Sequence, residues 1–406
     1  MLSANEYYEI DHNNGSLKKR VRGPKSLKPH LTVLCDDLRG AYIKGMTIRD
    51  RSLQKDHTDY IFQCRTILLY WTGDYPAQAL VSGTHSKTCH WCTHKTTPAP
   101  EISRRCWCDF RRYLPEGHHL REHASFGTPE HREAPSPRTH TQFVKDGKAN
   151  QQHRGFKKDS PYHRTGVKML SPLASLPLFN LVWDVLPDMM HIITGIWKRH
   201  IFAMFVGTRK PTRPKERSSW SKRDNDNLIR DHNTALVNLE GWILSKKEQE
   251  ELDQRSMNLG GEPKWIRNNI KVCTHSSTLT SHDWMLLIQT AGHYLLAGLF
   301  ETQPHKRECL LRLLDACNAC LNTTSAYNSE NRDVIDHVKL QVVEALCYVE
   351  TYMPNTELPV MMHILLHVPD SIYRWNAVRN FWEFFNERYY CLFFLLLIYN
   401  SVFLFT

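Results

Sequence analysis

The sequence predicts an α/β protein that joins a small strand-containing core to a large, mostly helical part. The segment 66–71 is a short apolar run that ends at Thr-Gly-Asp, which is typical of a buried central strand. Segments 282–301, 305–321 and 331–353 carry apolar residues at helical spacing. The chain has 406 residues, 41% of them apolar, so it is long enough to bury a sizeable core.

The N-terminal part divides into an arm, a core and a linker. Residues 1–27 are polar and basic, which predicts a flexible arm. Residues 28–125 are expected to form the core, beginning with an amphipathic helix from Pro29. Residues 126–166 are rich in Pro, His and Ser without an apolar period, so we expect a linker.

The C-terminal part is expected to be helical. Residues 167–257 are predicted to form a helical insertion, with one helix starting near Pro187 and Asp188. Residues 258–390 are predicted to form a further helical region. The apolar tail 391–406 is interpreted as a buried segment or an abnormal chain end, with a membrane anchor as the less favoured alternative.

The chain carries a formal net charge of +10, which favours a polyanionic partner, DNA first and an acidic membrane surface second. A role of this charge in solubility alone is the alternative. A basic loop provides candidate phosphate contacts, and a merely solvated loop is an equally weighted interpretation. The candidate nucleic-acid residues are Arg209, Lys210, Arg213, Lys215 and Arg217.

Twelve cysteines and 23 histidines make metal binding the main chemical hypothesis. Residues 1–20 lack the apolar stretch of a signal peptide, so thiols or metal ligands in a reducing compartment are expected. Cys89 and Cys92 have the Cys-x-x-Cys spacing that lets two thiolates bind one tetrahedral Zn²⁺. The other ligands are expected from Cys106 or Cys108 and His118 or His119, with Cys106 and His118 preferred. Coincidental spacing is the alternative.

Two further pairs are interpreted as core packing. Cys317 and Cys320 also have the Cys-x-x-Cys spacing, but they lie in an amphipathic helical stretch. His363 and His367 are four residues apart in an apolar helix, a spacing suited to a metal. No Glu follows His363 as in a metalloprotease motif, so packing is preferred for this pair.

Four residues are candidates for catalysis. Asp74 follows the predicted strand, where a carboxylate can face a substrate. Asp188 and His191 are three residues apart, on one face of a helix. The alternative for this pair is an acid at a helix N-terminus beside a buried His. Glu387 lies one helical turn after Glu383.

Seven motifs in order resemble the transposase family of CACTA (En/Spm-type) DNA transposons. The first three are W-T-G-D-Y-P-A-Q-A-L-V-S-G at 71–83, C-H-W-C at 89–92 and R-R-Y-L-P-E-G-H at 111–118. The others are L-P-D-M-M-H-I-I-T-G-I-W-K-R at 186–199, S-H-D-W-M-L-L-I-Q at 281–289, M-M-H-I-L-L-H-V at 361–368 and A-V-R-N-F-W-E-F-F-N-E-R-Y at 377–389. The resemblance covers roughly residues 23–390.

The resemblance implies an RNase H-like core with a helical insertion, and an Asp-Asp-Glu triad that binds two Mg²⁺ or Mn²⁺ ions for DNA strand cleavage and transfer. In this implied scheme, Asp74 is the second acid and Glu387 the third, with Glu383 less favoured. Cys89, Cys92 and His118 match the family's Cys-x-x-Cys and following His. Asp188 and His191 match its Asp-x-x-His, which favours a functional role for them.

Two departures from the family pattern shape the expected function. No acid in an Asp-Gly strand precedes Gly23, so the first acid and the first strands of the core are expected to be missing. The apolar tail replaces the polar sequence that the family has after Glu387. We therefore expect a transposon-derived, DNA-binding and catalytically inactive protein. The alternatives are an active metal-dependent nuclease or transposase and a non-enzymatic zinc-dependent DNA- or protein-binding factor.

The expected compartment is the nucleus, with the cytoplasm as the alternative. Homo-oligomer formation is left open by the sequence, and a membrane partner is not expected.

Overall fold

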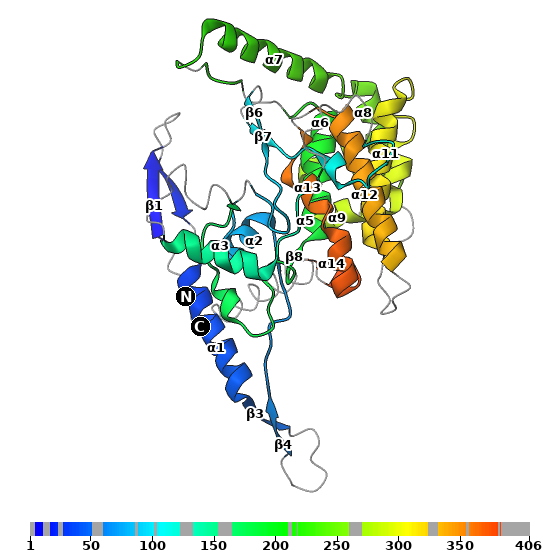
Figure 1. Ribbon diagram of the computed structural model, residues 1–406. Coiled ribbons are helices and arrows are strands. Elements are labelled where there is room, and N and C mark those ends of the chain that lie inside the picture. The colour runs from blue at the N-terminus through cyan, green and yellow to red at the C-terminus, as the bar shows by residue number, and fades with distance from the viewer. Residues whose placement is uncertain are drawn as a thin grey trace. The chain divides into compact units, whose positions relative to one another are not determined.

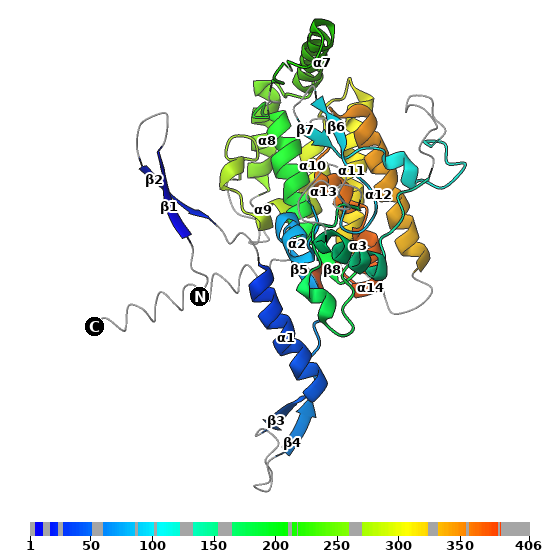
Figure 2. The same ribbon diagram turned by 60° about the vertical axis from the view of Figure 1, so that its left-hand side comes forward.

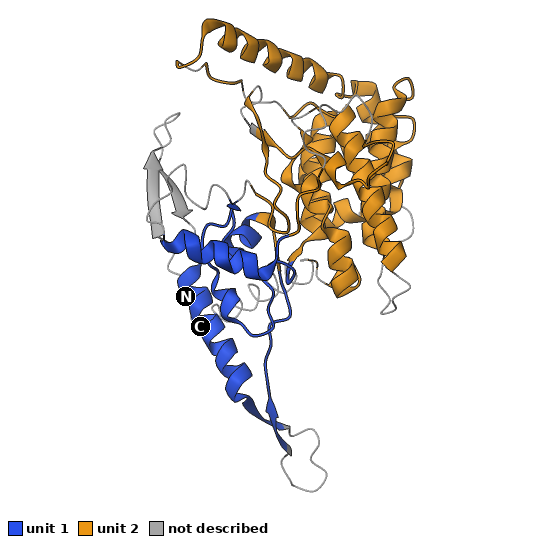
Figure 3. Cartoon of the chain, viewed as in Figure 1, with its two compact units in different colours: residues 1–71, 76–86, 138–185 blue, residues 72–75, 87–137, 186–406 orange. Residues whose placement is uncertain are grey.

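The computed structural model describes most of the chain. The described ranges are 5–10, 17–22, 27–50, 60–85, 88–100, 104–121, 133–152, 165–209, 213–216, 218–259, 270–323, 332–354, 357–380 and 382. The chain forms two compact units, each built from separate stretches of sequence (Figure 3). Unit 1 contains 1–71, 76–86 and 138–185, and unit 2 contains 72–75, 87–137 and 186–406.

Unit 1 contains two antiparallel hairpins and a small set of helices (Figure 1). The expected N-terminal helix is confirmed as α1, with Pro in its first turn and Leu31 and Cys35 buried. The strands are β1 (Asn5–Ile10), β2 (Leu17–Arg22), β3 (Met46–Asp50) and β4 (Tyr60–Cys64). The helices are α1 (Lys28–Lys44), α2 (Tyr75–Ser82), α3 (His140–Gln152) and the 3-10 helix η5 (Pro172–Ser175), with Tyr75 itself in unit 2.

Helix α3 lies inside the segment that was predicted to be a linker, so that prediction is wrong for 140–152. Its Phe143 is buried and provides an anchor that the polar composition hides. Gly147 allows the helix to approach closely, because a Cβ there would lie 2.9 Å from the Cα of Leu170. Each predicted domain is one continuous stretch of sequence, whereas both units of the structure combine separate stretches.

Of the predicted central strand 66–71, only Trp71 lies in a strand. Residues 66–70 have no regular secondary structure, and the strand begins as β5 (Trp71–Gly73), which pairs with β8 (Val185–Pro187). The N–H of Trp71 donates to the carbonyl of Asp184, the residue just before β8. Because the start of one strand is bonded to the start of the other, the two run in the same direction. Within the described residues every sheet is two-stranded, and β6 (Thr97–Ala99) pairs with β7 (Arg104–Cys106).

Unit 2 is mostly helical, and α11 and α12 lie side by side in it (Figures 1 and 2). The helices predicted at 305–321 and 331–353 are confirmed as α11 (Pro304–Asn322) and α12 (Arg332–Tyr352). The stretch predicted at 282–301 contains α9 (Ser281–Leu286), η8 (Leu287–Ala291) and α10 (Gly292–Leu296). The other helices are η2 (Phe110–Tyr113), α5 (Met189–Ile193), η6 (Thr194–Phe202), α6 (Ala203–Phe205), α7 (Lys222–Glu240), α8 (Lys246–Asn258), η7 (Ser276–Thr278), α13 (Val360–Leu365), α14 (Val368–Trp375) and η11 (Val378–Asn380).

The core of unit 2 is packed with large aromatic side chains. Trp197 and Trp284 are fully buried, and Phe202 makes an edge contact with Trp284 at a centroid distance of 4.8 Å. Gly195 in η6 brings α13 close, since a Cβ at this position would lie 2.6 Å from the Met361 side chain. This packing fixes the position of α13 in the unit.

None of the helices in the described ranges is both long enough and apolar enough to cross a membrane. The apolar tail 391–406 lies outside the described residues, so the interpretations of that segment stay predictions.

Candidate metal centre

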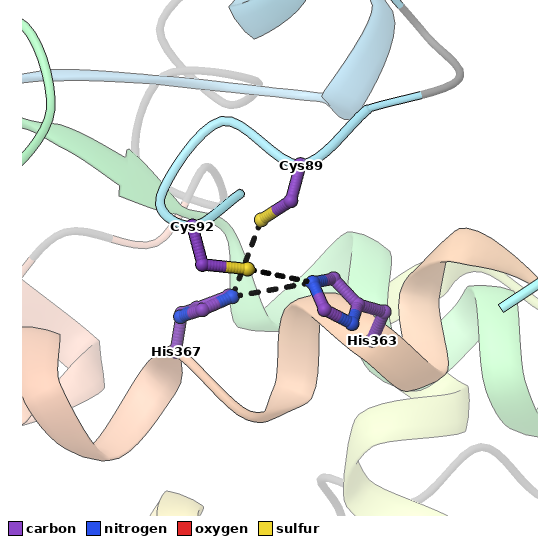
Figure 4. A group of neighbouring side chains, drawn as sticks. All are labelled: Cys89, Cys92, His363 and His367. Carbon is purple, nitrogen blue, oxygen red and sulfur yellow. Dashed lines mark hydrogen bonds between the residues drawn. The ribbon is translucent and has the colours of Figure 1, made fainter. Parts of the chain in front are cut away.

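Cys89 and Cys92 lie in a tight loop whose backbone points both sulfurs to one side (Figure 4). Thr88 and Lys95 pair as an isolated bridge that closes the loop. Inside it, the N–H of Cys89 donates to the His94 carbonyl at 3.2 Å. The N–H of Trp91 donates to the sulfur of Cys89 at 3.3 Å. The loop therefore presents two preoriented sulfur ligands.

The partners of these thiols come from the far end of the chain. His363 belongs to α13, and His367 follows one helical turn later, immediately before α14. The i, i+4 spacing places both imidazoles on one side of this helical segment. Their Nε2 atoms are 3.4 Å apart and face the cysteine loop (Figure 4).

The distances between the four side chains fit one tetrahedral zinc ion. Zn–S bonds of about 2.3 Å and Zn–N bonds of about 2.05 Å give tetrahedron edges of about 3.5 Å between S and N and about 3.3 Å between two N atoms. The sulfur of Cys89 is 3.2 Å from Nε2 of His367, and that of Cys92 is 3.5 Å from Nε2 of His363. All four ligand atoms lie within 4.8 Å of one another.

Burial adds a second argument for a cation. All four side chains are buried, with His363 fully excluded from solvent. Thiols are weak hydrogen-bond partners, so a shared cation would stabilise these buried groups better than their contacts with one another do. The residues therefore fit a metal such as zinc.

The ionisation of Cys92 and His363 favours metal binding, whereas the protonated thiol of Cys89 would have to lose its proton to a metal. Burial raises the pKa of the Cys89 thiol well above its ordinary value. Burial acts in the same direction on Cys92, but the hydrogen bond with Cys89 and the nearby His363 outweigh it, so the pKa of Cys92 is well below its ordinary value. Burial lowers the pKa of His363. Thiolate and neutral imidazole are the forms that bind zinc.

Aromatic side chains surround the four ligands. Trp91 stacks on His367 with a centroid distance of 5.4 Å, and Trp107 stacks on His363 at 4.6 Å. The hydroxyl of Tyr113 lies 3.4 Å from the sulfur of Cys92. Such outer contacts orient ligands and restrict water, and both effects strengthen metal binding.

His94 adds a further imidazole beside the two histidines of the centre. It is buried, and its ring lies 4.4 Å from that of His363 between centroids. Burial is the main cause that lowers the pKa of His94 to about 3, so its ring is neutral. Both of its ring nitrogens lack a hydrogen-bond partner among the described residues.

The residues predicted to complete the zinc site differ from those that the structure places beside Cys89 and Cys92. Cys106 lies with its sulfur 3.9 Å from that of Cys108, outside the four-residue group. His118 is bonded through Nε2 to Glu344 at 2.9 Å. The assignment of His363 and His367 to core packing is replaced by their place beside the thiols. Sequence proximity does not point to His363, because it lies 271 residues from Cys92.

Cys317 and Cys320 fit the packing prediction. Both thiols are fully buried on α11, and neither belongs to a group of potential metal ligands among the described residues.

Asp188 caps a helix and holds His191. The carboxylate of Asp188 accepts hydrogen bonds from the backbone N–H groups of Met190 and His191, at the start of α5. Its Oδ2 also contacts Nδ1 of His191 at 2.5 Å. Asp188 is thus the acid at the helix N-terminus, and its contact with Nδ1 fixes the orientation of the His191 ring.

Asp74 lies directly after β5, as Asp188 lies directly after β8. The two strands are paired and run in the same direction, so the backbones of both acids follow neighbouring strand ends. The next residue, Tyr75, donates its hydroxyl to the carbonyl of Thr88 at 2.9 Å. The segment with Asp74 is therefore tied to the residue that precedes Cys89.

The remaining predicted site residues have separate positions. Glu383 and Glu387 lie outside the described residues, as do Lys210 and Arg217. Arg213 and Lys215 are exposed. Arg209 instead forms an ion pair at 2.8 Å with Glu357, which is fully buried, so this arginine has a structural partner.

Comparison with known proteins gives one family match. Residues 19–149 match a family model described as "Transposase family tnp2". The matched segment is less than half of the chain and contains Asp74, Cys89 and Cys92, while Asp188, His363 and His367 lie beyond it. No curated protein and no solved structure matches the chain.

Proposed function

We propose that this chain is a transposon-derived, DNA-binding protein of the CACTA transposase type, in which Zn²⁺ bound by Cys89, Cys92, His363 and His367 stabilises the fold. The observation that carries the zinc proposal is the buried four-ligand group with tetrahedral spacing. The family match at 19–149 supports the transposase origin. The net charge of +10 supports the DNA partner.

The proposed role of zinc is structural. Four protein ligands complete a tetrahedral set and leave no position for a substrate, which is typical of structural zinc sites. The ligands join the loop after Asp74 to helix α13. We therefore propose that zinc holds the loop with Cys89 and Cys92 against helix α13 within unit 2, so that DNA binding depends on zinc through the fold.

We predict that Cys89→Ser lowers the affinity for a labelled DNA duplex by about tenfold or more, because the loop loses its metal and its position. Fluorescence anisotropy at several salt concentrations measures this affinity. Asp74→Ala should bind like the unmodified chain. If the double variant Arg213→Ala/Lys215→Ala binds the duplex with a salt dependence shallower by about two, these residues contact phosphates.

The outcome that contradicts DNA binding is an affinity for the duplex that is undetectable or independent of salt in the zinc-loaded chain. Cys64→Ser is the matched control, since Cys64 is half-buried and stands outside the zinc group. Equal DNA affinity of the Cys89→Ser and Cys64→Ser variants would show that DNA binding does not depend on zinc. DNA binding itself would then stand, and the proposed role of zinc in it would be contradicted.

The second candidate function is metal-dependent cleavage of DNA. The observation in its favour is the position of Asp74 and Asp188 after neighbouring strands, where carboxylates could share Mg²⁺ or Mn²⁺ ions with the scissile phosphate. The engagement of Asp188 with its own helix N-terminus weakens that candidate.

Cleavage predicts Mg²⁺- or Mn²⁺-dependent strand breaks in DNA that carries transposon ends, abolished by Asp74→Ala. Gel analysis of end-labelled duplexes measures the breaks, and Asp333→Asn, on an exposed acid of α12, is the control. If the DNA stays intact with both metals and all substrates, cleavage is contradicted and DNA binding is the remaining function.

A further inference from the structure

A second group of metal-binding atoms lies in unit 2, where the chain enters η2. Cys108 and Asp109 immediately precede this 3-10 helix, and Glu350 reaches them from α12. One ligand atom from each of these three residues lies within 4.8 Å of the others. The sulfur of Cys106, at the end of β7, is 3.9 Å from that of Cys108.

The geometry of the two sulfurs is suited to a shared metal. Two thiolates bound to one tetrahedral zinc ion are about 3.8 Å apart, given Zn–S bonds of about 2.3 Å. The separation of 3.9 Å between Cys106 and Cys108 is close to this value. Cys106 is not within 4.8 Å of all the other ligand atoms, so it stands as a neighbouring thiol beside a three-residue group.

Backbone hydrogen bonds hold the carboxylate of Glu350 in position. Its two oxygens accept the N–H groups of Asp109 at 2.7 Å and Phe110 at 2.9 Å. Each carboxylate oxygen has a second lone pair that remains available to a cation. Asp109 adopts a left-handed conformation with φ 68°, which is uncommon outside glycine and fixes where its side chain leaves the backbone. These contacts are the outer-shell support that metal ligands commonly have.

The group is rich in negative charge once its thiols ionise. The hydrogen bond with Cys106 raises the pKa of Cys108, and burial and the charge of Glu350 act in the same direction. Burial raises the pKa of Glu350 despite its two backbone hydrogen bonds.

This group is distinct from the Cys2His2 centre. Trp107, the residue between the two cysteines, stacks on His363 and His94 of that centre. Cys106 and Cys108 instead hydrogen-bond to Thr97, on strand β6. No ligand is shared between the two groups.

We propose that Cys108, Asp109 and Glu350 form a second binding site for a divalent cation of the zinc class, with Cys106 as a neighbouring thiol. Mixed sulfur and oxygen ligands suit Zn²⁺, whereas Mg²⁺ and Ca²⁺ prefer oxygen alone. Three ligands leave one position for water or for the thiol of Cys106. The group is half-buried to exposed, so ions reach it from solvent.

The test is the metal content of the full chain, stripped with a chelator, reloaded with zinc and dialysed. We expect two zinc ions per chain, and one in each of Cys108→Ser and Glu350→Gln. The controls are Cys64→Ser, which replaces a thiol outside both groups, and Asp333→Asn, which neutralises an exposed acid on the same helix as Glu350. Both should keep two ions.

Cobalt loading provides a readout that does not depend on stoichiometry. Cys108→Ser should remove part of the absorption that arises from charge transfer between thiolate and Co²⁺, and leave the part that arises from Cys89 and Cys92. A wild-type chain with one ion, whose cobalt spectrum is unchanged by Cys108→Ser, overturns the second site: Glu350 then serves as a cap for η2 alone. If Cys92→Ser loses an ion but Cys108→Ser and Glu350→Gln do not, the Cys2His2 centre is supported and the second site is contradicted.

Discussion

Replacement of Cys92 by Ser is expected to remove one zinc ion per chain and to lower the free energy of unfolding of unit 2 by several kcal/mol. Zinc would join two segments separated by 271 residues. A permanent cross-link across a loop of that length restricts the unfolded chain by about 5–6 kcal/mol in the chain-entropy model. Zinc binding is reversible, so its contribution also depends on the concentration of free metal.

Metal analysis and chemical denaturation, with and without a chelator, measure this effect. The chelator should lower the denaturation midpoint of the wild-type chain more than that of Cys92→Ser, because the variant has no metal at this centre to lose. His363→Gln should behave like Cys92→Ser, although its ligand comes from the other end of the chain. A wild-type midpoint insensitive to the chelator contradicts the prediction, and Cys64→Ser controls for the loss of a thiol.

Replacement of Glu357 by Gln is expected to destabilise unit 2 by about 3 kcal/mol or more, the cost of breaking a buried ion pair by removal of one partner. Glu357 is fully buried and accepts hydrogen bonds from His200 and Arg209, both at 2.8 Å. The variant keeps the shape of the side chain but removes its charge, so the guanidinium of Arg209 loses its anionic partner. The adjacent Leu358 accepts the N–H of Trp107, which links this network to the wall of the metal centre.

Urea denaturation followed by circular dichroism measures the change in stability. Glu301→Gln is the control, since Glu301 is exposed and its charge lies in solvent. A loss below about 1 kcal/mol, the range of exposed ion pairs, would contradict the buried-pair interpretation. Arg209→Ala should destabilise the unit in the same way. A weaker DNA affinity of that variant would therefore not identify Arg209 as a phosphate contact.

Local sequence patterns predicted several helices of this chain. The apolar residues of α11 and α12 repeat at helical spacing over long stretches. This pattern predicts an amphipathic helix that buries its apolar face. Asp188 identified the start of α5, because a carboxylate at this position accepts backbone N–H groups whichever fold surrounds it. These features depend on residues close in sequence.

The segment 66–70 shows the limit of such patterns. Its β-branched and bulky apolar residues predict a buried strand. In the structure, however, Ile67 and Leu69 are exposed, and the paired strand is formed by Trp71–Gly73. A strand needs a neighbour for its backbone hydrogen bonds, and composition does not supply one. Helix α3 shows the reverse, since one buried Phe143 and the close approach at Gly147 stabilise a helix in a polar segment.

The sequence by itself determined half of the metal centre, and the tertiary structure decided the other half. Cys89 and Cys92 were identified because two thiolates on one tight turn form a local unit with a fixed spacing. The spacing of His363 and His367 shows that they form a pair. Whether they pack in the core or bind a metal depends on which side chains face them. The packing of α13 in unit 2 brings Nε2 of His363 to 3.5 Å from the sulfur of Cys92, 271 residues away, and this proximity favours ligation. A metal site joins atoms in space, and spacing along the chain predicts only the part of the site that folds locally.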